Sequence, residues 1–174
     1  MPHATRALCP SATNGTPGTV TLYVESAVTR SIDVTYWAYF DDNRDGVADR
    51  RVKLYTGLGI RDTHAVINNL RWGLDGWIYA THGYSSGEVK SGDGQRTFAT
   101  GGSGVVRFRP DGSAFEQYNS RNGNTWGLET TWDGQIFWTQ PTSGTVFFHS
   151  LLPESVLAKG KLPGTTSWKG MIVN

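Results

Sequence analysis

The chain has 174 residues, a formal net charge of +1, 22 glycines and a single cysteine, Cys9. This length fits one compact domain, and interspersed charges without a basic run exclude an electrostatic nucleic-acid footprint. The lone cysteine excludes an intrachain disulfide, a cysteine-based zinc site and a haem attachment site, whereas glycine for turns and aromatic residues for strands favour an all-β chain.

The first 30 residues differ in pattern from the rest of the chain. Residues 1–18 are rich in Ser, Thr, Gly and Pro and show no hydrophobic period, which indicates a loose segment before a strand-like run at Val20–Val24. No secretory signal is visible at the start, and no apolar run is long enough for a membrane helix. We therefore assign residues 1–30 to a poorly ordered or atypical N-terminal segment and residues 31–174 to the folded domain.

From Ile32 onward the sequence reads as short strands joined by tight turns. Four Asp-Gly pairs lie between alternating apolar runs, which is a strong hairpin signal because glycine adopts a positive φ without steric cost. These pairs are Asp45-Gly46, Asp75-Gly76, Asp111-Gly112 and Asp133-Gly134. The predicted strands are Val34–Phe40, Arg51–Tyr55, Asn69–Gly73, Trp77–Thr81, Val105–Arg109, Ala114–Asn119, Leu128–Trp132, Gln135–Thr139 and Thr145–Leu151.

An internal repeat organises these strands. The stretch WGLDGWIYATHGYSSG aligns with TTWDGQIFWTQPTSG when the two Asp-Gly pairs are superposed, an offset of 58 residues. Between the two lies another hairpin, so the repeating unit is a four-stranded antiparallel meander. Repeated meanders of this length predict a β-propeller, and a sandwich of hairpins is the alternative. The chain holds two and a half to three blades, whereas closed propellers have typically 4–8.

In such blades the tight turns lie on one face and the longer connections lie on the opposite face. Loop faces of a rigid scaffold commonly carry binding and catalysis. The longer connections hold the polar candidates His64, Asn68, His82, Arg121, Asn122, Asn124 and Gln140.

His64 is the catalytic candidate, because it directly precedes an innermost strand and a neutral imidazole can take a proton near pH 7. A loop histidine that only bonds to its neighbours is the alternative. Arg121 is a candidate for binding an anionic cofactor through its planar guanidinium, or else a solvated loop arginine.

The hairpin after Phe40 carries a candidate metal loop. Asp41, Asn43, Asp45 and Asp49 occupy relative positions 1, 3, 5 and 9, and glycine occupies position 6, as at the front of a calcium loop. Position 12 is Val52 instead of a bidentate glutamate. The stretch therefore predicts either a weak structural Ca²⁺ site or a carboxylate-rich turn.

Three stretches carry a resemblance to a known family: DDNRDGVADRRVKLYTGLGIRDTHAVINNLRWGLDGWIYATHG, GSGVVRFRPDGSAFEQY and NTWGLETTWDGQIFWTQPTSG. Together they resemble the propeller of the membrane-bound dehydrogenases abundant in planctomycetes and, more distantly, the soluble quinoprotein glucose/sorbosone dehydrogenases. The match runs from about Phe40 to Val173. It implies a six-bladed propeller in the intact protein, exported or periplasmic, that oxidises a sugar or related alcohol with pyrroloquinoline quinone and Ca²⁺.

The resemblance also implies residue roles. His64 takes the place of the general base, and Gln140-Pro141 takes the place where backbone carbonyls hold Ca²⁺. Arg121 and Asn124 lie where the family contacts the quinone, although Gly123 stands where arginine is expected. Half a ring would be inactive alone and would need the missing blades or a second copy. The alternative is a non-catalytic propeller that binds glycan or protein on the same rim.

Overall fold

The computed structural model describes residues 7–10, 19–25, 33–43, 45–62, 64–85, 87–98, 103–120, 123–140, 147–150 and 159. The strands are β1 (Ala7–Pro10), β2 (Thr19–Glu25), β3 (Asp33–Asp41), β4 (Arg50–Gly59), β5 (Ile67–Trp72), β6 (Ile78–His82), β7 (Lys90–Ser91), β8 (Gly104–Phe108), β9 (Phe115–Ser120), β10 (Leu128–Thr130), β11 (Ile136–Thr139) and β12 (Phe147–Ser150). Among the described residues, no helix has the length and apolar character needed to cross a membrane.

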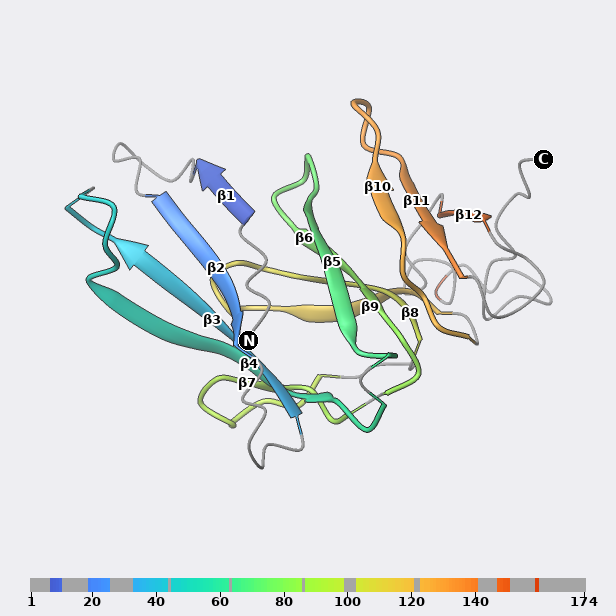
Figure 1. The fold of residues 1–174 in the computed structure, drawn as a ribbon, viewed down its shortest axis with the longest axis horizontal. Coiled ribbons are helices and arrows are strands. Elements are labelled where there is room, and N and C mark those ends of the chain that lie inside the picture. Colours follow the sequence, from blue (N-terminus) through green and yellow to red (C-terminus); the bar gives the residue numbers. More distant parts are fainter. Residues whose placement is uncertain are drawn as a thin grey trace.

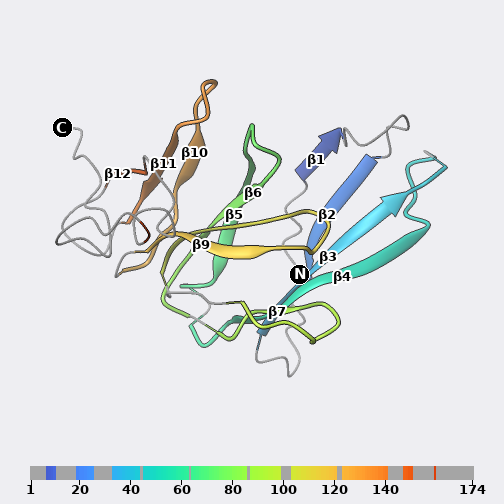
Figure 2. The ribbon, with the colours of Figure 1, turned by 180° about the vertical axis from the view of Figure 1, so that it is seen from behind.

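The strands form three antiparallel meanders, which confirms the all-β, partial-propeller prediction. The first blade has the order β1-β2-β3-β4, with the short β7 added outside β4, the second has the order β5-β6-β8-β9 and the third β10-β11-β12. The three sheets follow one another in chain order across the molecule (Figures 1 and 2). The first strand of the second blade, β5, contacts both β1 and β10, so the first strands of all three blades lie side by side. This places them next to a shared axis, as in a propeller.

The Asp-Gly turns have the backbone geometry that the sequence predicts. Their glycines have φ values of 89°, 74°, 80° and 85°, at Gly46, Gly76, Gly112 and Gly134. Each turn joins two consecutive antiparallel strands, namely β3–β4, β5–β6, β8–β9 and β10–β11. A side chain with a Cβ would be strained at such φ values, which explains why glycine closes every one of these hairpins.

The start of the chain is more regular than its composition predicts. Residues 1–18 were expected to be loose, but Ala7–Pro10 forms β1 and pairs with β2, which itself pairs with β3 from Thr19↔Asp41 to Glu25↔Thr35. The expectation of a loose segment is therefore wrong for β1. Backbone groups of a neighbouring strand supply its hydrogen bonds regardless of side-chain propensity. As an edge strand, β1 also tolerates Pro10, which has no N–H to donate.

The connection between β6 and β8 is not the simple loop that was expected. It crosses to the first blade, where β7 pairs with β4 and the Gly92 N–H donates to the Leu54 carbonyl at 2.8 Å. Glycine permits this close crossing: a Cβ on Gly87 would lie 2.0 Å from the Gly57 carbonyl oxygen. The segment therefore ties the outer strand of the first blade to the second blade.

Two hydrophobic cores lie between consecutive blades. The first joins the first and second blades and is built around Phe108, whose ring stacks on Tyr36 at 5.0 Å and on Phe115 at 5.7 Å. The second joins the second and third blades around Trp138, which stacks on Phe148 at 4.2 Å. These cores hold the blades as one body and so position the connections at their ends.

Candidate functional site

The long connections bring polar groups from two blades together at one end of the molecule, here called the rim. The rim comprises residues 60–62 and 64–66 before β5, residues 83–85 after β6 and residues 123–127 before β10. The Asn124 side-chain amide donates to the His64 carbonyl oxygen at 2.6 Å, which links the third blade to the segment before the second. This agrees with the prediction that His64 and Asn124 share one face.

His64 has a carboxylate partner at this rim. Its Nδ1 lies 3.1 Å from Asp62 Oδ1, and its backbone N–H donates to the same oxygen at 2.9 Å. The imidazole itself is 87% exposed. Since Nδ1 faces Asp62, and Nε2 has no hydrogen bond to the described residues, Nε2 is the nitrogen available to an incoming molecule.

The Asp62 carboxylate is itself held in place. Its Oδ2 accepts the Tyr84 hydroxyl at 2.7 Å, and its backbone N–H and carbonyl both bond the Ser85 hydroxyl, at 2.8 and 2.9 Å. The Tyr84 hydrogen bond and the His64 backbone N–H hold the pKa of Asp62 below its usual range. Asp62 is therefore ionised at neutral pH and faces the imidazole as a charged acceptor.

A histidine with one nitrogen on a carboxylate and the other toward solvent is the geometry of a general base. The carboxylate selects the tautomer with hydrogen on Nδ1 and stabilises the imidazolium that forms when Nε2 takes a proton. His64 was expected from the sequence, whereas Asp62 and Tyr84 were not. The Asp-Thr-His spacing is a signal for Asp62, because an aspartate commonly bonds the backbone two residues on. Tyr84 gives no comparable signal.

Asn124 and Gln140 reach the same end as predicted, but they are buried rather than open to a ligand. Asn124 is 7% exposed and Gln140 is 2% exposed. A Cβ on Gly123 would lie 2.6 Å from Gln140 Cδ, so the chain passes directly over this side chain. The two amides therefore stabilise the rim from beneath instead of lining its surface.

His82 and the residue after it complete this buried layer. His82 is 1% exposed at the end of β6. A Cβ on Gly83 would lie 2.5 Å from both the Ala65 carbonyl and Asn124 Oδ1, so three segments meet there with no room for a side chain. The residues beneath the rim are therefore tightly packed.

The predicted metal loop closes on itself. Asp49 Oδ2 accepts the Asp42 and Asn43 backbone N–H groups at 2.8 and 3.3 Å, and Asp41 Oδ2 accepts the Gly46 N–H at 2.9 Å. Asp45 Oδ1 likewise accepts the Val47 N–H. Within the described ranges, no three His, Cys, Asp or Glu side chains are grouped so that they could hold a metal ion. These hydrogen bonds give the carboxylate-rich turn its shape, and the Ca²⁺ site stays a prediction.

The residues expected to contact a quinone do not form a binding site in the described part of the chain. Arg121 and Pro141 lie outside the described residues. Asn124 and Gln140 are buried against protein, whereas an anionic cofactor needs donors that face it. Among the described residues, Asn124 and Gln140 are therefore not oriented to hold a quinone.

Comparison with known proteins gives one match. A family model described as a domain of unknown function (DUF7133) matches residues 16–172. None of the curated proteins matches the chain, and none of the solved structures does.

Proposed function

For this chain, which belongs to the DUF7133 domain family, we propose a function in proton abstraction: the propeller presents His64 as the general base of an enzyme that oxidises a sugar or related alcohol. The observation that carries the proposal is the His64–Asp62 contact at 3.1 Å on an exposed imidazole. The exposure leaves the second nitrogen, Nε2, within reach of a substrate hydroxyl.

The rim residues divide the work between them. His64 Nε2 takes the proton of a substrate hydroxyl, and Asp62 stabilises the imidazolium that results. Tyr84, through its hydrogen bond at 2.7 Å, keeps Asp62 pointed at the imidazole. A redox cofactor, when bound, supplies the acceptor for the hydride.

The test uses two forms of the protein, the chain itself and a version extended to a closed ring. Each receives pyrroloquinoline quinone and Ca²⁺, and dye reduction is followed over a panel of sugars and alcohols. His64→Gln removes the base and is expected to lower kcat/KM of the extended form about 10²–10⁴-fold, the usual contribution of general-base catalysis. Asp62→Asn is expected to cause a smaller loss.

Asp42→Asn is the matched control, because this exposed carboxylate lies in the β3–β4 turn at the other end of the blades and pairs with Arg50. It should leave turnover unchanged. Equal turnover of His64→Gln and wild type would remove the base assignment. No turnover of any substrate by the extended form would discard the enzyme proposal.

Ligand binding on the rim without chemistry is the second candidate. It is favoured by exposed aromatic side chains: Tyr84 is 54% exposed and Trp126 is 42% exposed. Saturable binding of a glycan to the extended form, lost in Tyr84→Ala and unaccompanied by turnover, would establish this reading instead.

A further inference from the structure

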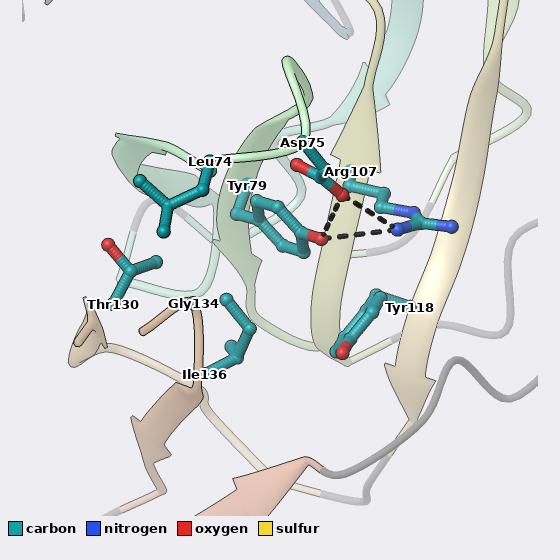
Figure 3. A pocket seen from close by; sticks show the side chains of 9 residues that line it. Leu74, Asp75, Tyr79, Arg107, Tyr118, Thr130, Gly134 and Ile136 are labelled. Carbon is teal, nitrogen blue, oxygen red and sulfur yellow. Dashed lines mark hydrogen bonds and ion pairs between the residues drawn. The ribbon is translucent and has the colours of Figure 1, made fainter. Parts of the chain in front are cut away.

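A pocket lies between the second and third blades at the end opposite the rim. Its volume is about 220 Å³, and its walls include Leu74, Asp75, Tyr79, Arg107, Tyr118 and Ile136 (Figure 3). Asp75 comes from the β5–β6 turn, the next three residues from β6, β8 and β9, and Ile136 from β11. The pocket is therefore assembled by tertiary structure from two blades.

One wall of the pocket is a network of paired charges. Arg107 donates from Nε to Glu116 at 2.7 Å, and its Nη1 lies 3.3 Å from Asp75 Oδ2. The Tyr79 hydroxyl donates to Asp75 Oδ2 at 2.9 Å and accepts from Arg107 at 3.1 Å. The guanidinium is 15% exposed and lies over the Trp77 ring at 4.3 Å. Each charge is thus satisfied within the protein and held rigidly.

Tyr118 differs from the rest of this wall. It is 6% exposed, its ring meets Tyr79 edge-on at 5.1 Å, and it lines the pocket. Its hydroxyl has no hydrogen-bond partner among the described residues. Burial raises the pKa of Tyr118, so the hydroxyl is protonated at neutral pH. The hydroxyl oxygen is not fully enclosed by protein, so it is open to a hydrogen-bond partner that enters the pocket.

Two turns that contribute residues to the pocket, β5–β6 and β10–β11, each carry an exposed apolar side chain. Leu74 is 74% exposed and Trp132 is 91% exposed. Trp132 belongs to the β10–β11 turn, and the pocket is lined by Thr130 and Gly134 on either side of it in the chain. A tryptophan this exposed is unusual, since large aromatic side chains are mostly covered in folded proteins.

We propose that this pocket binds one ring of a neutral saccharide, with Tyr118 and Asp75 as hydrogen-bond partners and with the exposed Trp132 of the β10–β11 turn as a stacking surface. Drug-sized ligands occupy about 300–1,000 Å³, so this pocket suits something smaller. A free anion would meet the Asp75 and Glu116 carboxylates, and a cation would compete with Arg107. A polyhydroxylated ring with an apolar face matches both the paired polar wall and the apolar walls of Leu74 and Ile136.

The test is saturation-transfer NMR and calorimetry on the intact chain, with neutral hexoses and their disaccharides as probes. Tyr118→Phe keeps the ring and removes only the hydroxyl, so the protein stays folded while affinity falls at least fivefold. Trp132→Ala, at an exposed position, should lower affinity at least tenfold and remove the transfer from the apolar face of the sugar. Circular dichroism of each variant verifies the fold.

Val47→Ala is the matched control, because Val47 is an apolar residue at the tip of a different turn and is 67% exposed. It should bind the sugars as wild type does. His64→Gln should also bind normally, which separates this site from the rim and from the function proposed there. The proposal is overturned if the wild-type chain binds none of the probes saturably, or if Tyr118→Phe and Trp132→Ala both bind as tightly as wild type.

Discussion

The two junctions between blades are built from the same kind of meander but differ in character. Between the first and second blades, Phe108 is fully buried and contacts Tyr36, Tyr55 and Phe115 through their rings. This junction is a continuous aromatic core, and β7 adds backbone pairing to it. This junction leaves little room for a ligand, because the facing side chains are buried against each other.

Between the second and third blades, the apolar core around Trp138 is smaller and polar at both ends. Asn124 bridges to His64 at the rim end, and the Arg107 pocket opens at the turn end. Both candidate sites therefore lie at this junction. We therefore expect function where packing between blades is incomplete, and rigidity from the neighbouring junction.

Phe108→Ala gives the largest expected effect and tests the structural half of this comparison. Removing a fully buried aromatic ring that stacks on two neighbours should cost about 3–5 kcal/mol of unfolding free energy, a large part of the stability of an ordinary domain. Urea denaturation measures the loss. Trp132→Ala, at a 91% exposed position, should stay within about 0.5 kcal/mol. If both variants lost a similar amount of unfolding free energy, the first junction would not be a main source of stability.

Asn124→Ala addresses the polar junction directly. It removes the donor to the His64 carbonyl and leaves a buried gap, at an expected cost of about 1–3 kcal/mol. The rate of backbone amide hydrogen exchange should increase mainly in β10 and in residues 64–68, and it should stay unchanged in the first blade. The exposed Gln95→Ala serves as the control. A uniform loss of protection from hydrogen exchange across all three blades would mean that the two junctions do not open independently.

Local turn chemistry made most of the architecture predictable. The positive φ of Gly46 and of its three counterparts follows from the Asp-Gly pairs, and the repeat then orders the strands into blades. β1 and β7 were not predictable, because neither carries a strand-like pattern: β1 forms by pairing with the neighbouring β2, and β7 forms by pairing with β4, which is distant in sequence.

The sites divide in the same way. His64 could be proposed from its place before an inner strand, and Asp62 was within reach through its spacing of two residues. Asn124 and Gln140 were placed at the correct end, yet only packing reveals that they are buried. The Arg107 pocket could not be predicted, since Asp75 and Arg107 are 32 residues apart and meet only in the folded protein.

Tyr55→Phe sharpens the description of the aromatic junction with a smaller change. The Tyr55 hydroxyl lies 2.9 Å from the Arg109 carbonyl and 2.8 Å from the Ala114 carbonyl, and it donates its single proton between them. The Ala114 oxygen also accepts the Arg109 N–H, so it keeps a partner in the variant. The expected cost is therefore only about 1 kcal/mol by urea denaturation. A loss as large as that of Phe108→Ala would show that hydroxyl bonding, not ring packing, dominates this junction.

The smallest expected effect is the pH response of the Asp62–Tyr84 pair at the rim. Because the pKa of Asp62 is lowered, its contribution to stability is present above about pH 4, its ordinary value, and is lost as pH falls through the lowered pKa. The pKa of Tyr84 is raised by the same hydrogen bond, so that contribution is present below about pH 10 and is lost above the raised pKa. Both groups are exposed, and solvent keeps the energies small. Asp62→Asn should bring the Tyr84 titration, followed by NMR, down toward pH 10. An unchanged Tyr84 titration would show that the carboxylate does not hold the tyrosine in solution, and Asp62 would then lose its role in orienting His64.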